Sequence, residues 1–518
     1  MSKNGKTFFM IIMNIWREKM LGRIIGRSAG EITFRFSYNE DVKIGEILVA
    51  EDKESNAIFF LRVIDIKYGH EGPENWGLLA AGEMLMMDKR NEEYTLIEKE
   101  RRLFKIGVCK PLGYVVENEF KKPKTIPSYF SGVRRPRKED YIFLEKYMGD
   151  IEIGKLRSGE SIIDIKVGID GKLLPYHIGI FATTGMGKSN LMRVMAASIM
   201  NAGRYGVLII DPHGEYYEGT GKGLKHHPLA EERLVVYSPN PEYGMNHLMI
   251  SPYEINVSDV EEIFNFSEAQ RDALYSLYGK YGKRWLIELQ ENDGETLAYE
   301  FDRRIQEMTF NVLKRRLERI YSSDIIHKDE KISIVDAIIK QLHEGKVVLV
   351  DTSSLYEYEE LLIAVMLARR ILNKNKSLFK NKEEFSKISP VLITVEEAQR
   401  VINEGIFAQI AREGRKFKVG LCAITQQPKL IKEEVLSQLN TFFILGLADE
   451  GDRNILKSSS KQDISHLEKE IQTLEIGEAL ITYPGAPFAL PVKIHLYDEF
   501  ISENAEKIKK DSVDEDFF

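Results

Sequence analysis

Cysteine is nearly absent from this 518-residue chain, which contains only Cys109 and Cys422. The two residues lie far apart and lack the paired spacing of metal-binding cysteines. This scarcity suits the reducing cytoplasm and argues against structural zinc. We therefore expect a cytoplasmic protein without a zinc-stabilised domain.

Long apolar runs are also missing. The longest run near the start is FFMIIM, which is too short for a membrane span or a signal peptide. We therefore expect no association with a membrane. Met10, Met13 and Met20 precede the first predicted domain, so translation could begin later than residue 1. We interpret residues 1–19 as an N-terminal extension.

The chain also lacks an excess of positive charge. The chain has 72 Lys and Arg residues against 80 Asp and Glu residues, a net charge of −8, and its pI is about 5.9. This balance excludes a uniformly basic DNA-binding surface. If the protein binds DNA, its basic residues must be concentrated in one place, such as the lining of a ring channel.

A phosphate-binding loop is the first motif present. The apolar run HIGIF, residues 177–181, leads into ATTGMGKS and then into the helix-forming NLMRVMAASIM. Strand, glycine-rich turn and helix form the context that a P-loop requires. The first glycine of the strict pattern is Ala182 here. The residues predicted to bind ATP are Thr184, Gly185, Met186, Gly187, Lys188, Ser189 and Asn190, and the Ser189 hydroxyl is a candidate Mg²⁺ ligand.

Two adjacent carboxylates end a second apolar run. VLITV is typical of a buried parallel strand, and Glu396 and Glu397 follow it. Ligands bind at the carboxyl ends of such strands, which predicts that the pair lies beside the P-loop. Glu396 is then a candidate for holding Mg²⁺, and Glu397 for activating the attacking water. The alternative is a solvated pair at the start of a helix.

Another strand, VLII, ends in Asp211, a candidate for the Mg²⁺ site. His213 and Glu215 lie on the loop that follows it. A single histidine is more often structural than catalytic, and a catalytic role for His213 is the minor alternative.

Arg412 and Arg415 are three residues apart, so in a helix they would share a face. They predict either a solvated basic face or an arginine finger that reaches the γ-phosphate of a neighbouring subunit. Gln426 ends the strand LCAIT, where a neutral amide can sense the γ-phosphate.

Five motifs follow one another along the chain: the P-loop, DPHGEYY, VEEAQ, AREGRKFKVG and TQQPK. Their order and spacing resemble those of the HerA-type DNA translocases of the wider HerA/FtsK group. The resemblance covers about residues 20–496. It implies that Arg415 is the finger acting in trans and Glu397 the catalytic base. Two positions depart from the family pattern. Tyr176 stands where an arginine often touches the nucleotide, and Gln427 replaces an arginine in the family's S-Q-R-P.

The resemblance and the patterning predict an α/β fold with a RecA-like P-loop NTPase core. A small HAS-type β-barrel is expected at 20–120 and a linker, rich in proline and basic residues, at 121–150. The linker is either a solvated tether or a minor phosphate contact. The core is expected at 151–250 and 340–498, with a helical insertion at 251–339. Residues 499–518 are expected to form a brace or a frayed end.

The predicted function is an ATP- and Mg²⁺-dependent homohexameric motor that holds double-stranded DNA in its ring channel. The resemblance implies that it works with a NurA-type nuclease in DNA end resection and double-strand break repair. Two alternatives are a motor coupled to a membrane machine, as in conjugation and secretion, and a nucleotide-gated scaffold that does not hydrolyse ATP.

Overall fold

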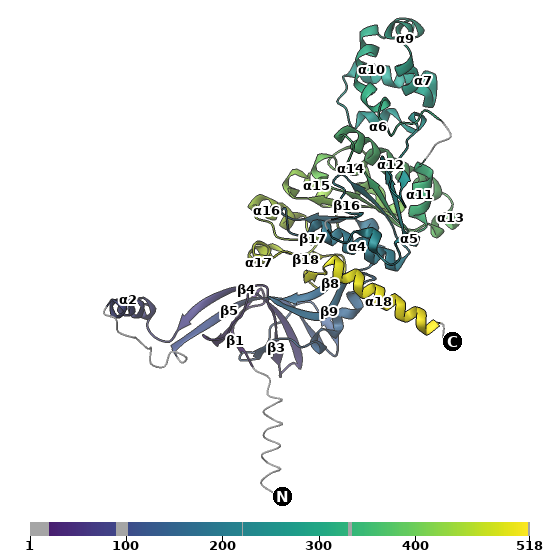
Figure 1. Cartoon of the computed structure of the whole chain (residues 1–518). Coiled ribbons are helices and arrows are strands. Elements are labelled where there is room, and N and C mark those ends of the chain that lie inside the picture. Colours follow the sequence, from purple (N-terminus) through teal and green to yellow (C-terminus); the bar gives the residue numbers. More distant parts are fainter. Residues whose placement is uncertain (1–19, 90–101, 220, 330–333, 516–518) are drawn as a thin grey trace.

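The computed structural model describes residues 20–89, 102–219, 221–329 and 334–515. Three parts are stacked along the molecule in Figure 1: a β-barrel, a central α/β core and a helical cap. The predicted extension at 1–19 lies outside the described residues. No helix among the described residues is long and apolar enough to cross a membrane.

The barrel closes because β2 pairs with both β1 and β5, so six strands form a ring in the order β2-β1-β7-β3-β4-β5. Phe34, Phe59 and Leu61 are fully buried inside it. A helix, α2 (Trp76–Asp88), lies between β4 and β5 in the chain. The six barrel strands are β1 Gly22–Ser28, β2 Glu31–Ser37, β3 Ile47–Asp52, β4 Ala57–His70, β5 Leu103–Val116 and β7 Gly132–Arg134, and β6 Glu119–Lys121 pairs with β5 outside the ring.

The interpretation of residues 121–150 as a linker is wrong for part of this segment. Strand β7 pairs with β1 and β3 and completes the barrel. Arg134, which contributed to the basic and proline-rich composition, is buried, and its guanidinium donates to Glu51 and to Asp140 at 2.6 and 2.7 Å. Composition suggested a solvated tether because it does not reveal the pairing of this cation with Glu51, 83 residues away, or the strands on either side of β7.

The core is a twelve-stranded sheet in the order β13-β12-β14-β11-β15-β16-β10-β17-β18-β19-β8-β9. The strands from β13 to β17 are parallel, and the remaining pairings are antiparallel. The strands are β8 Ile151–Ser158, β9 Ser161–Ile169, β10 Ile178–Phe181, β11 Gly206–Asp211, β12 Leu234–Ser238, β13 Asn246–His247, β14 Val347–Asp351, β15 Val391–Val395, β16 Val419–Thr425, β17 Thr441–Ile444, β18 Glu478–Thr482 and β19 Leu490–Ile494.

Helices cover both faces of this sheet, which is why its central strands are apolar throughout. Alternate residues of β11 show the division. Leu208 and Ile210 join the cluster that includes α12 and α14, whereas Val207 and Ile209 join the one that includes α4. The covering helices are α4 Lys188–Ala202, α5 Ala230–Arg233, α11 Val335–His343, α12 Glu357–Leu378, α13 Lys382–Lys387, α14 Gly405–Glu413, α15 Glu433–Leu436, α16 Glu450–Ser459 and α17 Glu468–Thr473.

The helical cap stands at the end of the core opposite the barrel (Figure 1). Fully buried Trp285, Phe310 and Leu317 join its helices to the core cluster around α12. Its helices are α6 Val257–Glu261, α7 Glu268–Tyr281, α8 Trp285–Glu291, α9 Gly294–Glu300 and α10 Glu307–Tyr321. The last helix, α18 (Tyr497–Glu515), buries Tyr497, Phe500 and Ile501 in the cluster that contains α4.

The predicted α/β fold, with a P-loop NTPase core behind a small β-barrel, is confirmed. Barrel and core share one hydrophobic cluster, to which the barrel contributes Ile47, Val49 and Phe60. A buried ion pair between Arg157 and Glu470, at 2.9 Å, lies close to this junction. The barrel is therefore packed on the core rather than tethered to it.

Candidate nucleotide site

The P-loop occupies the turn between β10 and α4. Gly185 and Gly187 have φ angles of +82° and +100°, which side-chain-bearing residues rarely adopt. A Cβ at Gly185 would meet nothing within 4 Å, so the backbone geometry alone requires glycine there. The first N–H groups of α4 have no partner within the helix and can bind an anion.

Lys188, the first residue of α4, is half-buried, and its Nζ donates to the Ala182 carbonyl at 3.3 Å. Burial lowers the pKa of this ammonium. The negative charges of Glu397, Glu396 and Glu215 oppose this decrease. A cation in this position fits the negative charge of a triphosphate. The carbonyl of Ala182, where the strict motif has glycine, contributes to holding the lysine.

The carboxylate pair lies where its strand predicted. Strand β15 ends at Val395, and Glu397 follows with a φ of +46°, an uncommon backbone conformation for a side-chain-bearing residue. Its Oε2 accepts from Gln399 Nε2 at 2.6 Å, and its Oε1 is 3.4 Å from Gln426 Nε2. Two neutral amides therefore orient Glu397.

Gln426 connects this carboxylate to the P-loop. Its Oε1 accepts from the Thr184 hydroxyl at 2.5 Å. Thr184, Gln426 and Glu397 thus form one chain of contacts across three segments that are far apart in the sequence. The amide of Gln426 therefore lies between the phosphate loop and Glu397, and its role as a γ-phosphate sensor stays a prediction.

The loop that follows β11 contacts two of the candidate metal ligands, Glu396 and Ser189. The Ser189 hydroxyl donates to Glu215 Oε2 at 2.6 Å, and Glu396 accepts from the Tyr216 hydroxyl. Burial raises the pKa of Glu396 above its ordinary value, and the Tyr216 bond opposes that rise. Hydroxyl and carboxylate oxygens are the ligands that Mg²⁺ prefers.

Asp211, the other candidate for the Mg²⁺ site, accepts hydrogen bonds from the loop that follows it. It is buried, and its two carboxylate oxygens accept from the backbone N–H groups of His213, Glu215 and Tyr216, at 2.9–3.2 Å. Burial raises its pKa. Its carboxylate thus shapes the loop that presents Glu215 and Tyr216, and its role at a Mg²⁺ site stays a prediction.

The sequence predicted no role for three residues of this site, although they lie in the motifs identified above. They are Gln399, Tyr216 and Glu215, and Glu215 contacts Ser189. Their positions in VEEAQ and HGEYY, directly after strand-end carboxylates, were the available signal. The types of these residues do not predict the conformation of the loops that carry them, so their contacts could not be inferred from the sequence.

Arg412 and Arg415 do not share a helix face. Helix α14 ends at Glu413, and Arg415 lies in the following 3₁₀ turn, Gly414–Phe417. The Arg415 guanidinium stacks over the Tyr176 ring, 3.8 Å from its centroid, and donates to the Tyr176 hydroxyl at 2.8 Å. Arg412 instead lines a cavity with Asn403 and Lys432.

Arg415 also lies at the opposite edge of the sheet from the P-loop of its own chain. It precedes the amino end of β16, whereas Gln426 follows the carboxyl end of that seven-residue strand. At about 3.3 Å per residue, the strand alone separates them by roughly 20 Å. An extended arginine side chain cannot span this distance, so Arg415 does not reach the nucleotide site of its own chain.

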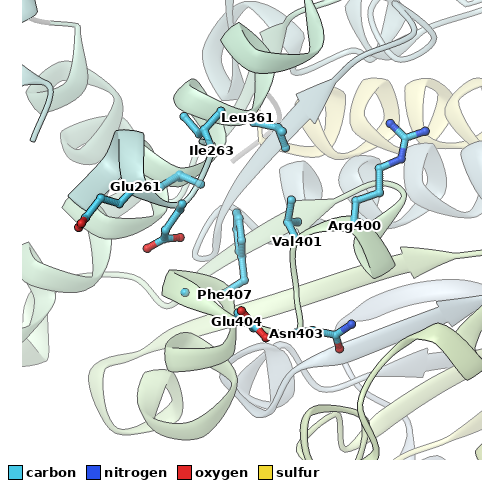
Figure 2. Close-up of a pocket in the computed structure, with 11 residues that line it drawn as sticks. Glu261, Ile263, Leu361, Arg400, Val401, Asn403, Glu404 and Phe407 are labelled. Atoms are coloured by element: carbon cyan, nitrogen blue, oxygen red, sulfur yellow. The ribbon is translucent and has the colours of Figure 1, made fainter. Parts of the chain in front are cut away.

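Another cavity, of about 450 Å³, is not suited to a nucleotide (Figure 2). It opens between α6, α12 and the segment 400–407 that follows Glu396 and Glu397. Three carboxylates, Glu261, Glu262 and Glu404, line it against a single arginine, and this excess of negative charge disfavours phosphate binding. The nucleotide site is therefore the P-loop edge of the sheet.

A phosphate loop between a parallel strand and a helix, beside strand-end carboxylates and a polar amide, defines a P-loop NTPase. Residues 151–371 match the model of the family described as "Helicase HerA, central domain". The chain is 31% identical to the DNA double-strand break repair helicase HerA of Sulfolobus acidocaldarius, over 68% of this chain and 70% of that protein. It therefore belongs to the HerA family, and the resemblance noted in the sequence is confirmed.

Two further proteins show how widely the likeness extends. A probable helicase of Methanocaldococcus jannaschii, MJ1565, is 27% identical over 88% of this chain and 92% of its own length. The structure of VirB4 of Thermoanaerobacter pseudethanolicus matches with a TM-score of 0.45 and 16% identity, covering 67% of this chain and 96% of that one. Likeness at the latter level carries no functional conclusion.

Proposed function

We propose that the protein is an ATP-driven motor that moves along or unwinds double-stranded DNA as a homohexameric ring. The observation that carries the ring is the placement of Arg415 at the edge of the sheet away from its own P-loop. Hydrolysis then requires Glu397 from one subunit and Arg415 from the next. The DNA substrate is supported by family membership and by relatives named DNA double-strand break repair helicases.

In this proposal each residue has a physical task. The α4 N-terminus and Lys188 bind the phosphates, while Ser189 and Glu396 hold Mg²⁺, with Glu215 and Asp211 supporting them. Bound Mg²⁺ would neutralise phosphate charge and align the β- and γ-phosphates. Glu397 orients and polarises the attacking water, Gln426 contacts the γ-phosphate, and Arg415 of the neighbour stabilises the charge of the transition state.

The nuclease partner belongs to the same proposal. Relatives that act in double-strand break repair support a role in DNA end resection beside a NurA-type nuclease. The test is to mix the protein with such a nuclease and linear duplex DNA, and to measure end degradation with and without ATP. We expect degradation to depend on ATP and on Lys188. Degradation at the same rate without ATP would contradict the partnership.

Replacing Lys188 with alanine is expected to abolish most ATP binding or turnover. The backbone cradle alone leaves the phosphate charge poorly compensated in a half-buried site. ATP binding by calorimetry and hydrolysis by phosphate release would be measured. The exposed Lys172→Ala is the matched control and should behave as wild type. Turnover at the wild-type rate in Lys188→Ala would overturn the site assignment.

Tyr176 is expected to position Arg415 rather than to touch the nucleotide of its own chain. Tyr176→Phe removes the hydrogen bond and keeps the ring, and should lower kcat about threefold to tenfold. Tyr176→Leu also removes the stacked ring, worth about 0.5–1 kcal/mol more, and should lower kcat further. The KM for ATP should stay unchanged in both variants.

This split between kcat and KM separates two roles for Tyr176. A rise in KM at constant kcat would show that Tyr176 contacts the nucleotide, as the family's arginine does at this position. Tyr275→Phe, which removes a 2.6 Å hydrogen bond to Glu261 in the helical cap, is the matched control. It should leave both constants unchanged.

A further inference from the structure

Helix α2 carries an apolar stripe that faces water. Leu78, Leu79, Leu85 and Met86 are 80%, 59%, 63% and 60% exposed. Their spacing, i, i+1, i+7 and i+8, places them on one face of the helix. Figure 1 shows α2 at the far end of β4 and β5, projecting from the body of the barrel. We call these four residues the α2 stripe.

Such a stripe is unfavourable in water, because each Å² of exposed apolar surface costs about 25 cal/mol relative to burial. The helix offers little polar compensation. Its sequence, WGLLAAGEMLMMD, contains no basic residue and two acidic ones, Glu83 and Asp88. Clustered apolar side chains at helical spacing, unlike single exposed leucines, mark an interaction surface.

The same chain has a second apolar surface that could receive the stripe. A hollow of about 430 Å³ lies on the barrel beside β1, β2 and the start of β5. Next to it, Met20, Tyr129 and Phe130 are 42–61% exposed. We call it the barrel hollow, and its apolar lining consists of Met20, Leu21, Ile25, Phe36, Phe104 and Phe130.

Charge and size both favour a second copy of this chain as the partner. Arg23 lines the barrel hollow and is opposite in sign to Glu83 on α2, whereas Arg35, which also lines it, is paired with Glu71 at 2.9 Å. Stable interfaces bury roughly 20–30 residues a side, whereas the α2 stripe has four. The contact is therefore too small to hold two chains alone and must add to a larger interface between copies.

We infer that the α2 stripe of one subunit docks in the barrel hollow of the next. The two surfaces differ, so the contact is head-to-tail, and repeating it around a closed rotation forms a ring. This inference rests on the proposed ring, whose shared nucleotide sites supply the larger interface. The barrels then contribute their own contacts to an assembly that the ATPase cores also join.

Cysteine cross-linking in the full-length protein tests this contact. Leu85→Cys and Phe130→Cys place one thiol on each surface, while native Cys109 and Cys422 are buried. A mixture of the two single variants should form cross-linked dimers under mild oxidation, and each variant alone should not. The double variant should form a ladder of linked subunits.

Three outcomes would overturn the inference. Dimers of Leu85→Cys alone would show that α2 pairs with α2. A double variant that cross-links only within one chain would show that α2 folds onto its own barrel. Absence of any cross-link in a protein that sediments as an oligomer would show that α2 is reserved for a different partner, such as a nuclease.

A charge substitution gives an independent measurement. Leu78→Lys combined with Leu85→Lys should raise the protein concentration needed for assembly at least tenfold in sedimentation velocity. Met308→Lys is the matched control, because Met308 is a 70% exposed residue on α10 in the helical cap. All these positions are exposed, so thermal unfolding should be unchanged.

Failure of this inference is distinguishable from failure of the proposed function. If wild type remains a monomer at all concentrations, the ring itself is wrong. If wild type assembles and the double lysine variant assembles equally well, the ring stands and only the α2 contact is wrong.

Discussion

Arg415→Ala is expected to bind ATP and to assemble normally, yet to hydrolyse ATP about 10³-fold or more slowly, the scale typical of an arginine finger. The guanidinium lies roughly 20 Å or more from the P-loop of its own chain, beyond the length of β16. Its loss therefore removes charge stabilisation from the neighbour's site and leaves its own phosphate cradle intact. Nucleotide affinity, sedimentation and steady-state hydrolysis would be measured together.

Mixing experiments show whether the finger acts between subunits. Arg415→Ala subunits keep Glu397, and Glu397→Gln subunits keep Arg415. At some junctions of a mixed ring, an intact Glu397 therefore meets an intact Arg415, and activity should partly return. Lack of recovery, once subunit exchange has been demonstrated, would contradict a finger in trans. Arg412→Ala, three residues away and directed to another cavity, is the matched control and should retain activity.

Glu397→Gln is expected to bind ATP with near wild-type affinity and to hydrolyse it about 10²–10⁴-fold more slowly. The amide preserves shape but cannot polarise the attacking water. In the structure, Gln399 and Gln426 orient this carboxylate, and Thr184 connects Gln426 to the P-loop. Trapped ATP in a stable assembly, detected after gel filtration, would be the direct readout.

The control for this variant is Glu404→Gln, an exposed carboxylate that pairs with Lys432 at 2.9 Å. It should change neither binding nor turnover. If Glu397→Gln instead lost binding and turnover to the same degree, Glu397 would be a structural residue, and the assignment of the catalytic base would be wrong.

The elements that the sequence predicted well are those in which local pattern and tertiary role agree. The run VLITV predicted a buried strand because both faces of β15 are covered by helices. The P-loop was recognisable because its glycines are needed for backbone conformation, as the positive φ at Gly185 and Gly187 shows. Strand-end carboxylates follow from the topology of a parallel sheet.

The elements that were missed depend on partners distant in sequence. Strand β7 is three residues long and is stabilised by pairing with β1 and β3, which no local pattern in 121–150 reveals. The backbone N–H groups that Asp211 binds belong to the loop after its strand, whose turn residue type did not reveal. The pairing of Tyr176 with Arg415 joins residues 239 positions apart.

The most direct test of the central claim is ATP hydrolysis measured with and without linear double-stranded DNA. We expect duplex DNA to stimulate ATP hydrolysis by the assembled wild-type protein. We expect no stimulation in Glu397→Gln or in Arg415→Ala, and restored stimulation when these two variants are mixed. Full ATPase activity in a monomer, indifferent to DNA, would contradict the account of a ring motor on duplex DNA.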